Sequence, residues 1–235
     1  MCSGRIDLAF ALKAFAAGMD GVFIGACRLN ECNYITHGNY HALNMAHLCK
    51  KIMARAGLNP ERLRIAFMSS ADGGLFTEVM NEFSRQIKEL GPVGSGGEAA
   101  PEEIGPRIEE AIKLVPYIKI TQRDKLAQRI GDPAKLEALY TPEEIEKLFS
   151  ETVSYYIDPQ KCQACMICAR KCPVEAIDGG KQRIHVIDQQ KCIKCGTCFE
   201  ACPERFGAVT RITGEPVPAP PPEENRGVVL AAKGA

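Results

Sequence analysis

The chain has 235 residues, which is enough for one large domain or two small ones. Its 29 lysines and arginines balance 29 aspartates and glutamates, so the formal net charge at pH 7 is zero. This balance argues against a nucleic-acid binder with a dense phosphate-neutralising surface, and against a polybasic membrane-surface protein. The most informative number in the composition is twelve cysteines.

The cysteines form two groups, four between residues 2 and 49 and eight between residues 162 and 202. A disulfide framework would require an oxidising compartment and therefore an export signal. The apolar segment near the N-terminus is not a clean signal peptide, because Asp7, Lys13 and Asp20 interrupt it. No run approaches the roughly 20 apolar residues that span a bilayer. We therefore expect a soluble cytoplasmic protein whose reduced thiols bind metal.

Residues 1–92 are predicted to alternate between helices and strands, as judged from apolar periodicity and from glycine and proline stops. The predicted elements, in chain order, are a helix capped by Asp7, a strand at 21–25, a helix from about Tyr40 to Gly57, a strand at 63–68 and a helix ending at Gly91. Such alternation predicts an α/β domain built on an open parallel sheet with crossover helices.

The first predicted helix follows directly on Met1–Arg5, where the pattern calls for a preceding strand. We therefore expect a sheet that lacks its first strand. Either another polypeptide completes this domain, or the segment derives from a longer domain.

Three further segments follow this domain. Residues 93–152 are predicted to be a flexible and helical linker, because a glycine-rich stretch precedes charged helical patterns. Residues 153–212 contain most of the cysteines, and residues 213–235 are predicted to be a proline-rich disordered tail.

The segment 154–212 contains an internal repeat with an offset of 30 residues, and each half carries C-x2-C-x2-C-x3-C-P. This is the spacing of bacterial two-cluster ferredoxins, in which the fourth cysteine of each run binds the other cluster. It predicts an α+β ferredoxin-like domain with two [4Fe–4S] clusters. The first cluster is assigned to Cys162, Cys165, Cys168 and Cys202, and the second to Cys192, Cys195, Cys198 and Cys172.

Structural zinc is the alternative for these cysteines, because paired C-x2-C motifs also occur in zinc ribbons. The proline after each fourth cysteine suits the first turn of a helix, and zinc binding does not explain it. A zinc-stabilised interaction module therefore remains as an alternative to the cluster assignment.

The N-terminal cysteines are harder to assign. Cys27 follows the first predicted strand, and ligands gather at the carboxyl ends of strands, so Cys2, Cys27 and Cys32 can meet at one site. Three thiols are one short of a cluster. Cys49 lies on the apolar face of its helix and is interpreted as a core residue. A thiol/disulfide-type reductase acting at these cysteines is a further alternative, although Cys27 and Cys32 form no C-x-x-C pair.

Recognisable motifs then add a family resemblance over residues 1–92. The patterns C-S-G-R from Cys2, G-x-C-x4-C-x-Y from Gly25 and G-N-Y from Gly38 resemble the delta subunit of methyl-viologen-reducing hydrogenase. The resemblance implies a [2Fe–2S] cluster at Cys2, Cys27 and Cys32, an incomplete set because the family has further upstream cysteines. It also implies electron transfer between a hydrogenase or formate dehydrogenase type subunit and a heterodisulfide-reductase-like flavoprotein.

Other polar residues offer weaker signals. Arg5 and Asn39 could position a flavin or a cluster, but they are interpreted as solvated or capping residues. The four histidines form no pattern with a cysteine or a carboxylate. No Ser–His–Asp set and no flavin or nicotinamide fingerprint is present. We therefore expect an iron–sulfur component of an oxidoreductase complex that is not catalytic alone.

Overall fold

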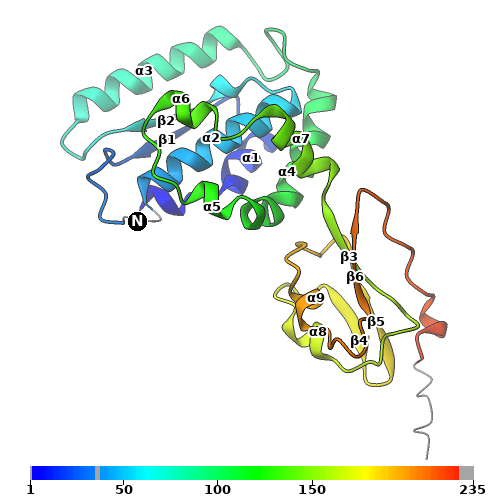
Figure 1. Ribbon diagram of the computed structural model, residues 1–235. Coiled ribbons are helices and arrows are strands. Elements are labelled where there is room, and N and C mark those ends of the chain that lie inside the picture. Colours follow the sequence, from blue (N-terminus) through cyan, green and yellow to red (C-terminus); the bar gives the residue numbers. More distant parts are fainter. Residues whose placement is uncertain (1, 35–37, 228–235) are drawn as a thin grey trace, which may run out of the picture. The chain divides into compact units, whose positions relative to one another are not determined.

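The computed structural model of the chain describes residues 2–34 and 38–227. Two compact units divide the chain, Met1–Lys147 and Leu148–Ala235, and each is a mixture of helices and small sheets (Figure 1). In the described ranges no helix is both long and apolar enough to cross a bilayer.

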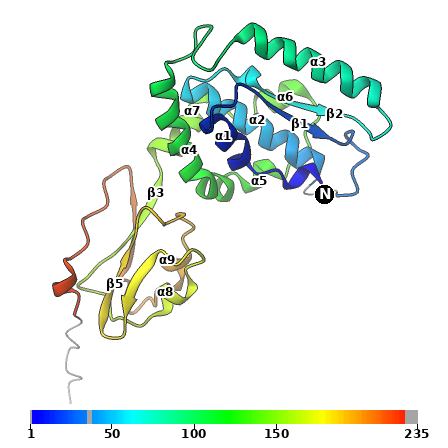
Figure 2. The same ribbon diagram turned by 180° about the vertical axis from the view of Figure 1, so that it is seen from behind.

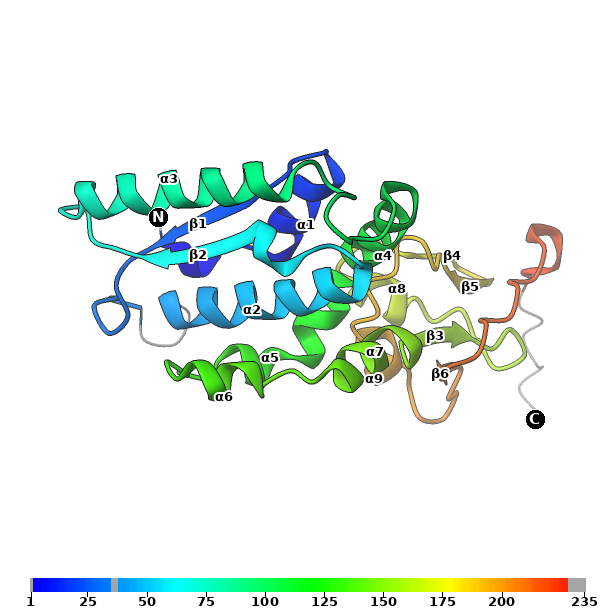
Figure 3. The same cartoon turned by 90° about the horizontal axis from the view of Figure 1, so that it is seen from above.

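The first unit is organised around a two-stranded parallel sheet. Strands β1 (Val22–Ala26) and β2 (Leu63–Phe67) pair directly, and helix α2 (Asn39–Ala56) connects them as a crossover. Helices α2 and α3 (Gly73–Leu90) lie on opposite sides of this sheet (Figure 3). Two 3-10 turns, Ser3–Arg5 and Pro60–Arg62, precede α1 and β2.

Helix α1 (Leu8–Ala16) begins where the sequence predicts, because the Asp7 carboxylate accepts a hydrogen bond from the Ala9 N–H at 2.9 Å. Its apolar positions, including Leu12 and Phe15, are buried. The helical periodicity predicts Met19 on the same face, but the helix ends before it and the side chain is 51 % exposed.

Helix α2 supplies the largest part of the core in this unit and ends at Gly57, whose φ of 84° needs a residue without a side chain. Helix α3 differs, because Phe83 is its one buried residue among those described. Leu75 and Phe76 occupy apolar positions of the helical pattern, yet their side chains are 40 % and 49 % exposed.

Helix α4 (Pro101–Thr121) packs against α1 and α2, and Ile108 and Ile118 are buried there (Figure 2). Helices α5 (Arg123–Leu126) and α6 (Pro133–Glu137) also contact α2. Much of the segment expected to be a linker thus belongs to the packed first unit. Helix α7 (Pro142–Ser150) crosses the boundary between the units. The division into four segments stays a prediction.

A buried ion pair holds the glycine-rich segment 91–98 onto this unit. Arg62 is fully buried, and its guanidinium binds both carboxylate oxygens of Glu98 at 2.7 and 2.9 Å. The remaining donors and acceptors are satisfied by backbone groups: Arg62 donates to the carbonyls of Asp20, Gly91 and Pro92, and Glu98 accepts from the N–H groups of Asn59 and Gly94. The segment is therefore fixed by paired charges that also satisfy the surrounding backbone groups.

The second unit shows the internal repeat as structure. Strand β3 (Val153–Ile157) pairs antiparallel with β6 (Val209–Thr213), and β5 (Arg183–Ile187) pairs antiparallel with β4 (Ile177–Gly180). In the repeat with its offset of 30 residues, β3 is equivalent to β5, and helix α8 (Ile167–Lys171) is equivalent to helix α9 (Thr197–Ala201). Equivalent backbone bonds recur, from Asp158 N–H to the Ala208 carbonyl at 2.7 Å and from Asp188 N–H to the Ala176 carbonyl at 2.8 Å.

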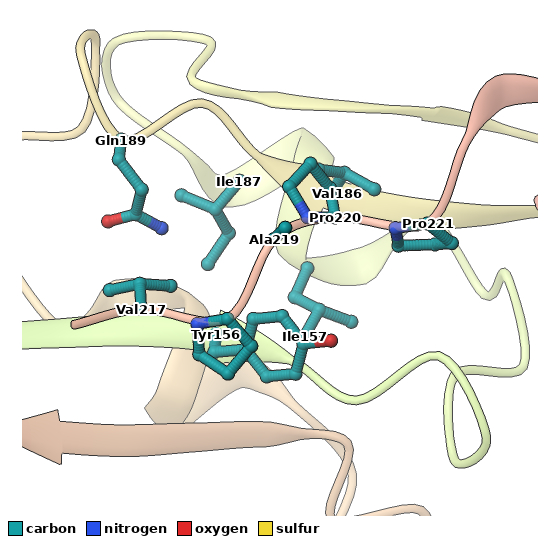
Figure 4. A pocket seen from close by; sticks show the side chains of 10 residues that line it. Tyr156, Ile157, Val186, Ile187, Gln189, Val217, Ala219, Pro220 and Pro221 are labelled. Atoms are coloured by element: carbon teal, nitrogen blue, oxygen red, sulfur yellow. The ribbon is translucent and has the colours of Figure 1, made fainter. Parts of the chain in front are cut away.

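The proline-rich segment after β6 is extended and contacts this unit as far as Gly227, which forms an isolated β-bridge with Arg183. Its residues Val217–Pro221 line a pocket together with Tyr156, Ile157 and Val186 (Figure 4). After the 3-10 turn Glu223–Asn225, the Arg226 carbonyl accepts a hydrogen bond from Ile184 N–H at 2.7 Å. The fixed φ of proline reduces the entropy lost on ordering such a segment.

Candidate iron–sulfur sites

The structure brings together the four cysteines assigned to the first cluster. Cys162 and Cys168 are buried, Cys202 is half-buried and Cys165 is exposed. Burial raises the pKa of Cys168 to about 11, and the nearby thiols of Cys162, Cys165 and Cys202 contribute to this rise. These three neighbours are the partners that the ferredoxin spacing predicts for Cys168.

The second quartet is gathered in the same way. Cys172, Cys192, Cys195 and Cys198 all line one apolar cavity between β3, α9 and the start of β4. Burial raises the pKa of Cys192, the Lys194 N–H lowers it, and the Cys195 and Cys172 thiols raise it. Burial also raises the pKa of Cys198 to about 12, with contributions from Cys192, Cys195 and, from the first quartet, Cys168. The two quartets are therefore close enough to interact electrostatically.

Two tight loops carry most of these thiols, and both use left-handed backbone. Cys165 is flanked by Ala164 and Met166 with φ of 49° and 65°, and Cys195 is flanked by Lys194 and Gly196 with φ of 57° and 83°. Left-handed conformations cost non-glycine residues about 1–3 kcal/mol and cluster at functional sites. Here they shape the two tight loops that carry Cys165 and Cys195.

Backbone N–H groups point at several of the sulfur atoms. Ala176 N–H donates to Cys172 Sγ at 3.3 Å, Lys194 N–H to Cys192 Sγ at 3.4 Å and His185 N–H to Cys162 Sγ at 3.5 Å. Cluster-bound thiolates accept such bonds, which help to set cluster potentials. The thiol sets, their burial and these donors fit [4Fe–4S] clusters.

His185 is a residue that sequence reasoning missed. The expectation that no histidine pairs with a cysteine is wrong for His185, which is 1 % exposed and whose Nδ1 lies 3.7 Å from Cys162 Sγ. Burial lowers the pKa of His185, against a smaller opposite effect of Asp178. The contact cannot be read from the sequence, because His185 and Cys162 are 23 residues apart. The one available signal is the repeat, in which His185 is the equivalent of Tyr155, 30 residues earlier.

The N-terminal thiols also converge. Cys2 Sγ lies 3.9 Å from Cys32 Sγ, and the Cys27 thiol adjoins Cys32. Burial would raise the pKa of Cys32, but N–H groups of Tyr34 and Asn39 and the other two thiols lower it; the pKa of Cys27 is raised by burial and by Cys32. Cys32 is therefore the more acidic thiol of the two.

The G-N-Y motif holds this loop in place. A side chain on Gly38 would come within 2.5 Å of Cys32 Sγ. Asn39 is 1 % exposed, and its amide donates to the carbonyls of Cys27 and Arg28 at 2.9 and 2.6 Å, so it fixes the cysteine loop and is not a solvated residue. The His37 side of this loop falls in 35–37, outside the described residues.

Cys49 stands apart from the other thiols. It is fully buried in α2, and burial alone raises its pKa to about 12. These properties fit a core cysteine. Over the described ranges, no group of three or more His, Cys, Asp or Glu side chains converges closely enough to hold a single metal ion.

Comparisons with known proteins cover both cysteine-bearing regions. Residues 1–91 match the family described as methyl-viologen-reducing hydrogenase, delta subunit, and residues 161–206 match the 4Fe-4S dicluster domain. An F420-non-reducing hydrogenase iron-sulfur subunit of Archaeoglobus profundus is 43 % identical over 91 residues, which are 39 % of this chain and 66 % of the relative. The F420-non-reducing hydrogenase vhu iron-sulfur subunit of Methanopyrus kandleri is 36 % identical over 92 residues, 39 % of this chain and 69 % of the relative.

A second kind of relative is much longer. One subunit of the ferredoxin/F(420)H(2)-dependent CoB-CoM heterodisulfide reductase of Methanosarcina acetivorans is 41 % identical over 110 residues, 47 % of this chain. The matched segment spans 14 % of that relative's length. The match to the hydrogenase iron-sulfur subunit of Methanopyrus kandleri covers 69 % of that relative's length, and the family match covers residues 1–91, which include Cys2, Cys27 and Asn39. The chain belongs to the methyl-viologen-reducing hydrogenase delta subunit family and carries, in addition, a ferredoxin-type 4Fe-4S dicluster domain.

Proposed function

We propose that this chain is an iron–sulfur electron-transfer subunit whose C-terminal unit holds two [4Fe–4S] clusters. Cys162, Cys165, Cys168 and Cys202 would hold the first cluster, and Cys192, Cys195, Cys198 and Cys172 the second. The observation that carries this proposal is the single apolar cavity lined by all four thiols of the second quartet, within a segment that matches the 4Fe-4S dicluster domain. When bound, the clusters supply one-electron carriers. The protein holds them, excludes water and donates hydrogen bonds to their sulfur ligands.

The proposal extends to a [2Fe–2S] cluster in the N-terminal unit. Cys2, Cys27 and Cys32 would provide three of its ligands, which the 3.9 Å contact between Cys2 and Cys32 supports. A fourth ligand would come from outside these three. The two-stranded parallel sheet is, in this proposal, the described part of an open parallel sheet with crossover helices.

The proposed partners follow from the two kinds of relative. The first kind is named for a hydrogenase, and the second for a heterodisulfide reductase. We therefore propose two electron-transfer partners for this chain. One is a hydrogenase or formate dehydrogenase type subunit, and the other is a heterodisulfide-reductase-like flavoprotein. The need to keep so many thiols reduced favours the cytoplasm as the location of this complex.

The test begins with the chain purified without oxygen. We expect about eight iron and eight sulfide from the two cubane clusters, with any further pair of iron atoms at the N-terminal site. Colourless protein containing zinc in place of iron would contradict the cluster proposal and support the zinc-stabilised module.

The second part of the test measures electron transfer. The dithionite-reduced chain is mixed with a purified heterodisulfide-reductase-like flavoprotein in a stopped-flow instrument. The loss of absorbance of the flavoprotein's flavin is recorded over time. We expect the clusters to reoxidise as the flavin is reduced. Full cluster content without flavin reduction would leave the cofactor assignment intact and contradict the assigned partner.

A further inference from the structure

The two halves of the ferredoxin repeat place different side chains beside their cysteine loops. His185 and Tyr155 are related by the offset of 30 and occupy the central positions of β5 and β3. Both are buried, with exposures of 1 % and 8 %. Each reaches the loop of the opposite half, since His185 contacts Cys162 whereas Tyr155 lines the cavity that the second quartet also lines.

His185 presents both ring nitrogens to sulfur. Its Nδ1 lies 3.7 Å from Cys162 Sγ, and its Nε2 lies 3.2 Å from the thioether of Met166. Gly179 leaves room for the ring, because a side chain at this position would come within 2.2 Å of it. The position of the imidazole is therefore built into the fold.

The chemistry of the two sulfur atoms decides where the proton sits. A neutral imidazole carries one N–H, and it needs an acceptor when buried. The thioether of Met166 is a weak acceptor, whereas a cluster-bound thiolate carries negative charge and accepts a stronger bond. The N–H of His185 therefore belongs on Nδ1, directed at Cys162 Sγ.

The equivalent tyrosine makes a different contact. The hydroxyl of Tyr155 lies over Gly196, the repeat equivalent of Met166, where a side chain would come within 2.8 Å of it. The second quartet has another donor instead, because Thr197 Oγ1 lies 3.2 Å from Cys195 Sγ. The repeat equivalent of Thr197 is Ile167, whose side chain carries no donor.

We propose that His185 donates its Nδ1–H to the Cys162 thiolate and thereby raises the reduction potential of the first cluster selectively. Reduction adds negative charge to a cluster and its sulfur ligands, so a hydrogen-bond donor at one ligand stabilises the reduced form. Thr197 acts in the same way on the second cluster. The two clusters of one repeat are thus tuned by two unrelated side chains. This inference rests on the proposed two-cluster function.

The decisive measurement is a redox titration of the full chain, followed by the low-temperature EPR signals of the two reduced clusters. In His185→Phe we expect the equilibrium constant for reduction of the first cluster to fall about tenfold, which lowers its potential by about 59 mV for a one-electron couple. The potential of the second cluster should stay unchanged. Thr197→Val is the matched variant, and it should lower the other potential only. His185→Asn keeps an N–H near the Nδ1 position and should retain most of the wild-type potential.

A spectroscopic test uses the unsubstituted chain, so it does not depend on the folding of a variant. His185 is the one histidine beyond residue 47. Isotope labelling of histidine should therefore reveal a nitrogen hyperfine coupling to the reduced first cluster, while the second cluster shows none.

Three results would overturn the inference. These are the absence of a histidine coupling, equal potentials in His185→Phe and wild type, or equal shifts in His185→Phe and His185→Asn, which would point to packing alone. Any of them, obtained with about eight iron per chain, leaves the proposed function standing. A chain that binds no iron would instead contradict the proposed function itself.

Discussion

In the unit Leu148–Ala235, three thiols of each quartet come from one short loop, as in Cys162–Cys168. In Met1–Lys147 the thiols of Cys27 and Cys32 come from the loop after β1, and they meet the thiol of Cys2, which precedes the first 3-10 turn. The first arrangement needs only local backbone geometry, here a pair of left-handed residues around the middle cysteine. The second depends on the packing of a whole unit.

The surroundings of the two sites differ as well. Cys168 and Cys198 are buried, and their pKa values are raised to about 11 and about 12, largely by burial. The Cys27 thiol is exposed, and Asn39 holds its loop by backbone hydrogen bonds. The thiols of the second unit are thus largely enclosed by their own domain, whereas the set formed by Cys2 and the loop after β1 includes an exposed thiol.

The largest expected effect is on cluster content. We expect Cys168→Ala to lower the iron content of the chain from about eight to about four, because one ligand of the first cluster is lost. Iron and sulfide analysis of the anaerobically purified chain measures it. Cys49→Ala is the control, since this buried cysteine belongs to the core of the other unit and should leave iron unchanged. Unchanged iron in Cys168→Ala would refute the assignment of this ligand.

The next effect separates the stability of the two units. Arg62→Ala leaves Glu98 buried and unpaired, so we expect the first unit to lose about 3–5 kcal/mol of unfolding free energy. Urea unfolding followed by helical circular dichroism measures the loss, while cluster absorbance reports on the second unit. Arg64→Ala is the control, because its pair with Glu82 is largely exposed and should be worth less than about 1 kcal/mol. Equal losses in both variants would contradict the buried-pair argument.

The smallest expected effect is a pH dependence confined to the first unit. Burial raises the pKa of Glu98, but Arg62 and two backbone N–H groups outweigh it and lower the pKa below its usual 4.5. The stabilisation of the folded first unit by ionised Glu98 is therefore complete above a pH equal to this usual pKa. It is lost as the pH falls through the lowered pKa of the folded state. The urea midpoint of the helical signal should fall on acidification, and less steeply in Glu98→Gln. An identical slope in that variant would contradict the linkage.

Local patterns in the sequence predicted a large part of the molecule. Asp7 and Gly57 mark helix ends that the structure confirms, and strands β1 and β2 lie within one residue of the predicted bounds. Such signals depend on residues a few positions apart, where the backbone geometry is nearly independent of the rest of the chain. The periodicity of α3 was less informative about burial, because Leu75 and Phe76 satisfy the helical pattern and remain exposed.

The cysteine spacing and the offset of 30 are properties of the sequence alone, and they determined both quartets as predictions and the pairing of equivalent elements. The tertiary structure decided what no spacing contains: the clamp of Arg62 on Glu98, the packing of α4 on α1, and the imidazole of His185 against Cys162. The two side-chain contacts join residues 36 and 23 positions apart, so they exist only once the chain has folded back on itself. Burial then gives them their effect, because a charge or hydrogen bond counts for more where water is excluded.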